Sequence, residues 1–191
     1  MIIQTHRLIG ENIFKSVNLN MGFELDRKNI IIGSVLPDVV PKYMRQKHFF
    51  SVSYDYILNK IQELYMDSNK ISIKEFSLRL GIITHYISDF FCTPHNDREY
   101  YKNHFIEHMQ FESKLHLLFA KEKSAKKIDI PSVDRFNYES VKALIDKLHE
   151  DYEKRGVSYE NDFVSTIEAV NMLSCMLISH CIAKNIVHSP A

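Results

Sequence analysis

The sequence predicts an all-α fold, and three observations support this prediction. Apolar residues recur at spacings of three and four through most of the chain, which is the pattern of helices with one buried face. Glycine and proline are scarce, at five residues each among 191, which argues against a turn-rich β-sandwich or barrel. The chain has no internal repeat and no linker of biased composition. We therefore predict a single multi-helix bundle domain over residues 1–191 with a substantial core.

The first two helices are predicted from their capping residues. Thr5 is a suitable N-cap for a helix over 6–17, whose isoleucines and valine form one apolar face. Asp26 is a suitable N-cap for a shorter helix that ends near Pro37. Residues 38–50 contain a further proline and are predicted to be a loop.

The middle of the chain contains two further predicted helices. One covers residues 51–67 and has an apolar stripe. The next begins after Ser72, because Ser72 and Glu75 match a capping box. It should end by Thr93, because the residue before a proline disfavours helical backbone.

The rest of the chain is predicted as three helices and two connections. A polar connector over 96–101 leads into a helix over 102–123, and an irregular link follows over 124–136. Helices over 137–155 and 160–187 end the chain. The last one has a broad apolar face, as expected of a central bundle helix.

Charge and cysteine content exclude some classes of function. Lys plus Arg and Asp plus Glu number 24 each, so no global charge attracts nucleic acid or anionic lipid, and no stable nucleic-acid partner is expected. Three cysteines without a CxxC pair give no disulfide framework. The N-terminus does not resemble a signal peptide, and no run reaches about 18 apolar residues, so no membrane span is expected. These features predict a cytoplasmic protein.

Two histidine–carboxylate pairs are the main chemical signal. His85 and Asp89 are four residues apart, and so are His108 and Glu112, so each pair lies on one face of a predicted helix. Both pairs have apolar neighbours, where a carboxylate is costly unless it is paired or binds a metal ion. His95 follows a proline between the pairs. A single pair is more often a hydrogen bond than a ligand set, but two pairs around His95 favour a metal site.

The order of five short motifs resembles the zinc-dependent phospholipase C family. The motifs are "THRLIG" at 5–10, "GSVLPD" at 33–38, "KHFF" at 47–50, "HYISDFFCTPH" at 85–95 and "HMQFE" at 108–112. The last two match the patterns H-x3-D-x5-H and H-x3-E. The sequence also resembles the amino-terminal domain of glycosylphosphatidylinositol-specific phospholipase D and, more distantly, the zinc-dependent single-strand nucleases. The last third of the chain has no matching motif.

The resemblance implies a helical bundle of the phospholipase C and zinc-nuclease type with two or three bound Zn²⁺ ions. The implied ligands are imidazoles, carboxylates and the amine of the first residue. They are Asp38, His48, His85 and Asp89 for one ion, His95, His108 and Glu112 for a second, and Met1 and His6 for a third, which shares Asp89. Iron, manganese and nickel accept the same types of ligand. His104 lies one turn before His108 and is an alternative ligand or an outer-shell partner.

The resemblance also implies a metal-dependent phosphodiester hydrolase that acts on a phospholipid or another phosphodiester. Asp38 is the implied acceptor of the proton from the attacking water. A nuclease or nucleotide phosphodiesterase with the same metals is the first alternative. A non-catalytic helical binding module stabilised by metal is the second. The loop around His48 also carries Lys42, Arg45 and Lys47, which either receive a phosphate or are simply solvated.

Overall fold

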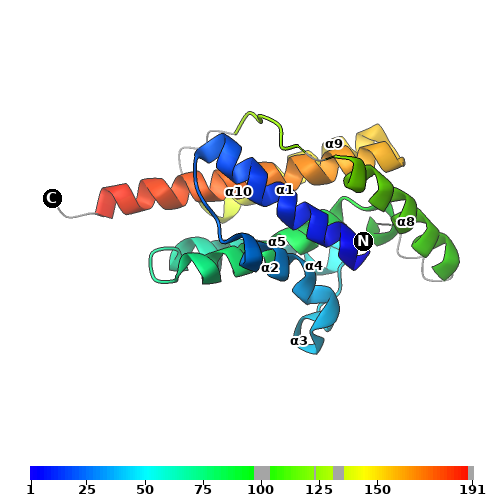
Figure 1. The fold of residues 1–191 in the computed structure, drawn as a ribbon, viewed down its shortest axis with the longest axis horizontal. Helices are drawn as coiled ribbons and strands as arrows, with labels where there is room; N and C mark the ends of the chain where they lie inside the picture. Colours follow the sequence, from blue (N-terminus) through cyan, green and yellow to red (C-terminus); the bar gives the residue numbers. More distant parts are fainter. Residues whose placement is uncertain (97–103, 123, 131–135, 189–191) are drawn as a thin grey trace.

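The chain is a bundle of α-helices in a computed structural model that describes residues 1–96, 104–122, 124–130 and 136–188 (Figure 1). All regular elements among the described residues are helices, which confirms the predicted all-α class. The helices are α1 (Ile3–Met21), α2 (Arg27–Val39), α3 (Pro41–Met44), α4 (Phe50–Asp67), α5 (Ile73–Phe90), α6 (Thr93–Asn96), α8 (Phe105–Lys121), α9 (Tyr138–Arg155) and α10 (Tyr159–His188).

The start of α1 differs from the prediction. The helix begins at Ile3, and its N-cap Ile2 makes no side-chain capping bond. The Ile2 carbonyl accepts hydrogen bonds from the backbone N–H groups of Thr5 (2.9 Å) and His6 (3.3 Å), so the first turn closes before Thr5. Thr5 is therefore not the N-cap. Its hydroxyl lies 3.0 Å from Nδ1 of His116, between α1 and α8.

The region after Asp26 is more helical than predicted. Asp26 does cap α2, because its carboxylate accepts from the Asn29 N–H at 2.9 Å. However, α2 continues through Pro37 to Val39, and α3 occupies part of the predicted loop over 38–50. Pro37 is buried, and tertiary packing of α2 outweighs the local cost of a proline inside a helix. As a result, Asp38 lies in the last turn of a helix.

The other predicted helices agree closely with the structure. Ser72 caps α5, which ends at Phe90, and α4, α9 and α10 have the predicted ends to within a residue. The described part of the link over 124–136 is not helical. Most of the predicted connector over 96–101, together with the predicted helix start at 102, lies outside the described residues.

Two glycines let α2 and α5 cross closely. A Cβ atom on Gly33 would lie 2.2 Å from the Leu78 carbonyl oxygen, and one on Gly81 would lie 2.4 Å from the Ile30 carbonyl oxygen. No larger residue fits either position without moving the backbone. The crossing places the end of α2, with Asp38, beside the second half of α5.

Helix α10 lies centrally and packs against α1, α5, α8 and α9. Its segment Tyr159–Lys184 is the one helix among the described residues that is long and apolar enough to cross a membrane by length and composition. We predicted no membrane span. Since 61% of the apolar window is buried inside the protein, its composition is accounted for by its place in the core.

Candidate metal centre

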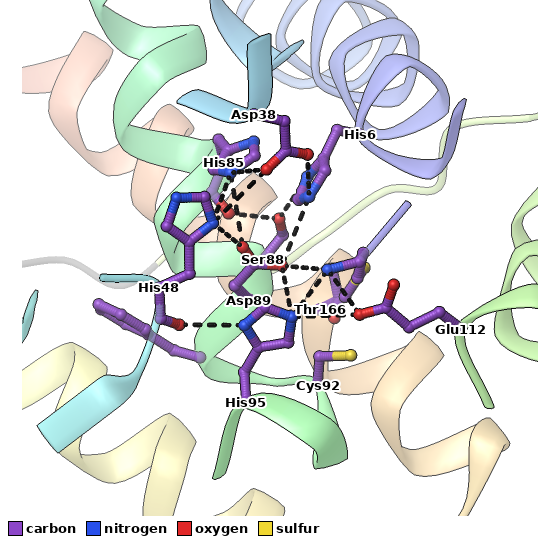
Figure 2. A network of polar contacts seen from close by, with 12 residues as sticks. His6, Asp38, His48, His85, Ser88, Asp89, Cys92, His95, Glu112 and Thr166 are labelled. Carbon is purple, nitrogen blue, oxygen red and sulfur yellow. Dashed lines mark hydrogen bonds and ion pairs between the residues drawn. The ribbon is translucent and has the colours of Figure 1, made fainter. Parts of the chain in front are cut away.

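The nine residues predicted as metal ligands lie in one connected network, and Figure 2 labels seven of them, all except Met1 and His108. They come from the N-terminus, from α1, α2, α5, α6 and α8, and from the segment between α3 and α4. Segments more than 100 residues apart therefore meet at one place. Whether these residues bind metal stays a prediction at this point.

Asp89 is at the middle of the network. Its Oδ2 lies 3.0 Å from Nδ1 of His48 and 3.4 Å from Nε2 of His85. Its Oδ1 lies 3.4 Å from Nε2 of His6. Asp38 faces the same group, with Oδ1 3.6 Å from both the His48 Nδ1 and the His85 Nε2. Three imidazoles and two carboxylates thus point their ligand atoms at a common region.

His6 has a ring nitrogen that suits a metal ion. The ring stacks on His85 at a centroid distance of 3.8 Å, and its Nδ1 lies 3.2 Å from the Ser88 hydroxyl. Its Nε2 is buried and has no hydrogen-bond partner among the residues that the structure describes. Burying a polar atom without a partner is costly. A cation bound between His6 and Asp89 would remove that cost, so the residues fit a zinc ion in donor type and placement.

The second half of the network contains the amine of Met1. This buried amine lies 2.7 Å from Oδ1 of Asp89, 3.2 Å from Oε1 of Glu112 and 3.0 Å from Nε2 of His95. Glu112 also lies 3.2 Å from His95 Nε2 and 2.8 Å from His108 Nε2. The protonated Met1 amine therefore places a positive charge between the carboxylates of Asp89 and Glu112.

Backbone carbonyls orient two of the imidazoles. Nδ1 of His85 lies 2.8 Å from the Ser34 carbonyl oxygen, and Nδ1 of His95 lies 3.3 Å from the His48 carbonyl oxygen. A carbonyl accepts only, so in each pair Nδ1–H donates and Nε2 is left without its proton. Metal-binding histidines usually have this kind of outer-shell partner.

Burial and neighbouring charges set the protonation states. Burial, together with nearby His6, holds the pKa of His85 well below its usual value, and burial also lowers the pKa of His95. Both rings are therefore neutral near pH 7, which is the form that binds metal. Burial alone would raise the pKa of Asp89, but His95, the Met1 amine and His6 outweigh it and hold this pKa well below the usual range.

The other two carboxylates have opposite shifts. Burial opposes ionisation of Glu112, but the Met1 amine, His108 and His95 bring its pKa below the usual range. Burial raises the pKa of Asp38. Asp38 is also the most accessible of the three carboxylates, with 21% of its side chain exposed against 0% for Asp89 and 6% for Glu112.

Cys92 belongs to a group of potential ligands that sequence reasoning missed. The Cys92 side chain is fully buried. The structure also places its thiol in a group with His95 and Glu112 whose ligand atoms lie within 4.8 Å of one another. Cys92 could have been identified from the sequence by its spacing, because it lies three residues after Asp89 and three before His95.

The structure separates the histidines of α8. His104 is the N-cap of α8, with φ −127° and ψ 57°, so it does not continue the helical stripe of His108 and Glu112. The contact with Glu112 comes from His108, whereas His116 contacts Thr5. Because α8 begins at Phe105, His104 and His108 are not equivalent positions on this helix.

Comparison with known proteins agrees with the motif order. The sequence profile of the family described as "Zinc dependent phospholipase C" matches residues 5–159. Searches of curated proteins and of solved structures found no match. The matched segment contains eight of the nine predicted ligands, with Met1 before it. On this match, which covers most of the chain, the protein belongs to the zinc-dependent phospholipase C family.

Proposed function

We propose that this protein is a metal-dependent phosphodiester hydrolase that acts on a phospholipid and uses two or three zinc ions. The observation that carries the proposal is the network around Asp89. It gathers imidazoles, carboxylates and an amine in a buried region, and it includes a buried His6 nitrogen with no hydrogen-bond partner among the described residues. Structural zinc sites are usually single and closed by four ligands. Nine candidate ligands are more than such a site needs.

The proposed ligand assignment is the one that the family resemblance implies. Asp38, His48, His85 and Asp89 would hold one ion, His95, His108 and Glu112 a second, and His6 with the Met1 amine a third that shares Asp89. Bound zinc would neutralise charge on the substrate phosphate and lower the pKa of a water molecule.

Asp38 is the residue that would accept the proton of the attacking water. It is the only carboxylate of the network with substantial exposure among the described residues, so it can contact water that enters from solvent. General base catalysis requires hydrogen-bond reach to that water. The buried Asp89 and Glu112 instead balance the charge of whatever cations the network holds.

A phospholipid is favoured over a nucleic acid by the charge of the chain. The net charge is zero with neutral histidines, whereas nucleic-acid binding depends on lysines and arginines that neutralise phosphates. The family description also refers to phospholipase C. Nuclease activity is the alternative outcome of the assay below.

Metal content is the first test of the proposal. The purified protein is loaded with zinc, excess metal is removed, and metal is measured by elemental mass spectrometry. Two or three ions per chain are expected. Zero or one ion per chain would contradict the proposal and favour the helical binding module.

Activity is the second test. The metal-loaded protein is given phosphatidylcholine vesicles or single-stranded DNA, and release of phosphorylated head group or of nucleotides is measured. We expect head-group release, with kcat about 10²–10⁴-fold lower for Asp38→Asn. Asp55→Asn, a carboxylate change on α4, serves as the control and should retain activity. Cleavage of DNA alone would assign the site to a nuclease.

A further inference from the structure

A second buried polar cluster lies next to the metal centre and contains none of its nine residues. Asp162 of α10 accepts three hydrogen bonds, two from Thr93 and one from Tyr152 of α9. The Thr93 N–H donates to Oδ2 at 2.7 Å, the Thr93 hydroxyl donates to Oδ1 at 2.9 Å, and the Tyr152 hydroxyl donates to Oδ1 at 2.9 Å. All three side chains are buried, and Asp162 is 0% exposed.

Thr93 is the first residue of α6, the helix that carries His95, and its hydrogen bonds to Asp162 fix the start of this helix. A helix of four residues is far too short to be stable by itself, so tertiary contacts must fix its position. The first N–H groups of a helix also lack partners within it and are usually capped by a nearby side chain. Here the capping carboxylate comes from a residue 69 positions away in the sequence.

His95 lies two residues after Thr93 and faces the metal centre. Its Nε2 is 3.2 Å from Glu112 and 3.0 Å from the Met1 amine. Its backbone N–H donates to the Cys92 carbonyl at 2.8 Å, so its position follows that of the turn before it. A displacement of Thr93 would therefore move His95 away from Glu112.

We propose that Asp162 is a positioning residue that fixes His95 for metal binding through Thr93. The inference rests on the proposed function, because it assigns His95 to an ion. The hydrogen bonds of Asp162 go to Thr93 and Tyr152 and not to the nine predicted ligands, and it lies three residues beyond the segment that matches the family profile. The last third of the chain has no recognised motif, and the proposed role of Asp162 connects this part of the chain to the metal centre.

The test compares two variants that remove hydrogen bonds from the same carboxylate. Asp162→Asn keeps the shape but has one acceptor oxygen in place of two, so the Thr93 N–H and the two hydroxyls can no longer all donate to it. Tyr152→Phe removes the third donor and leaves both bonds to Thr93 in place. If Asp162 only held α9 and α10 together, both changes would reduce thermal stability and leave metal binding unchanged.

Metal binding is measured by titration with ¹¹³Cd²⁺ and by cadmium NMR, which gives one signal for each occupied site. In Asp162→Asn we expect the signal of the His95 site to shift or broaden and its affinity to fall about 10–100-fold, as for other outer-shell partners. The remaining signals should not change. Tyr152→Phe should have the wild-type spectrum. Wild-type affinity and spectrum in Asp162→Asn would overturn the proposal.

A measurement on the metal-free protein separates this inference from the proposed function. Amide hydrogen exchange over residues 91–96 should be faster in Asp162→Asn than in Tyr152→Phe. If the wild type binds no metal but this exchange pattern holds, the hydrolase proposal fails and the positioning of His95 is retained. Equal exchange in the two variants would reject the positioning role.

A milder variant covers the case in which Asp162→Asn does not fold. Thr93→Val removes one hydroxyl and keeps the backbone N–H and the branched side chain. It should give a smaller change at the same cadmium signal, whereas Thr93→Ser, which keeps both donors, should restore the wild-type spectrum. An unchanged signal in Thr93→Val together with wild-type hydrogen exchange over 91–96 would also reject the proposal.

Discussion

The two sides of the metal centre are built differently. His6, His85 and Asp89 form a deep side, with side chains 0–1% exposed on the long helices α1 and α5. His95 and His108 belong to a shallow side and are 12% and 26% exposed. On the deep side, helical spacing and core packing fix the ligand atoms. The shallow side lies on α6, a helix of four residues, and on the first turns of α8, so its geometry depends on contacts from elsewhere.

Asp89→Ala should have the largest effect, because Asp89 joins the two sides. It contacts His6 and His85 on the deep side and His95 on the shallow side, and it also contacts His48 and the Met1 amine. We expect loss of metal from both sides. We also expect the metal-free protein to lose about 3–5 kcal/mol of unfolding free energy, because a buried ion pair is broken.

Metal content and urea unfolding of Asp89→Ala check this prediction. Asp67→Ala is the control, because Asp67 ends α4 and is partly exposed, with only Arg79 as its ion-pair partner among the described residues. An Asp89→Ala protein with full metal content would show that the two sides do not share this carboxylate.

Gly81→Ala should loosen the deep side alone. The added Cβ would meet the Ile30 carbonyl oxygen at 2.4 Å and the Ser34 nitrogen at 2.8 Å, so α2 and α5 would have to separate. Overpacking of this kind costs about 1–3 kcal/mol or more. The separation would also lengthen the bond between His85 and the Ser34 carbonyl.

Unfolding free energy and the cadmium signals of Gly81→Ala check this expectation. Gly10→Ala is a control with a milder clash, because its Cβ would lie 2.8 Å from the Ser34 hydroxyl oxygen, which can rotate away, and no closer than 3.2 Å to backbone, at the Ile31 Cα. Gly81→Ala should be clearly the less stable of the two. Equal stability would mean that the crossing of α2 and α5 does not constrain the deep side.

The pH dependence of stability should show that burying the ionised Asp162 carboxylate, which supports the shallow side through Thr93, costs unfolding free energy. Burial raises the pKa of Asp162 to about 6, against the lowering effects of the Thr93 and Tyr152 hydrogen bonds and the Met1 amine. Between about pH 4 and pH 6 the folded protein therefore retains a proton that the unfolded chain releases. The contribution of Asp162 to unfolding free energy should fall by about 3 kcal/mol as pH rises through this range.

Urea unfolding with chelator at several pH values checks this, comparing the wild type with Asp162→Asn. Stability of the wild type relative to the variant should be greatest near pH 4 and should decline up to pH 6–7. A difference between the two proteins that does not change with pH would mean that Asp162 titrates at an ordinary carboxylate pKa. Its burial would then impose no cost.

The same contrast explains what the sequence could predict. His85 and Asp89 were found because helical periodicity is a local property, and the helix caps at Asp26 and Ser72 are local as well. Other features depend on contacts between distant segments. The helix through Pro37 depends on packing against α5, and the support of His95 depends on Asp162, which no spacing rule links to it.

His149→Ala should have the smallest effect on metal, although His149 also contacts the segment that carries His95. Its Nε2 lies 3.1 Å from Asn96 Oδ1, and its ring stacks on Phe50 at 3.9 Å. Asn96 keeps two further bonds of its own, to the carbonyls of Phe90 (2.8 Å) and Cys92 (3.1 Å). We therefore expect a loss of about 1–3 kcal/mol in unfolding free energy with wild-type metal content and cadmium signals. If the signal of the His95 site moved as it does in Asp162→Asn, α6 would need support at both ends, and the shallow side would depend even more on distant contacts.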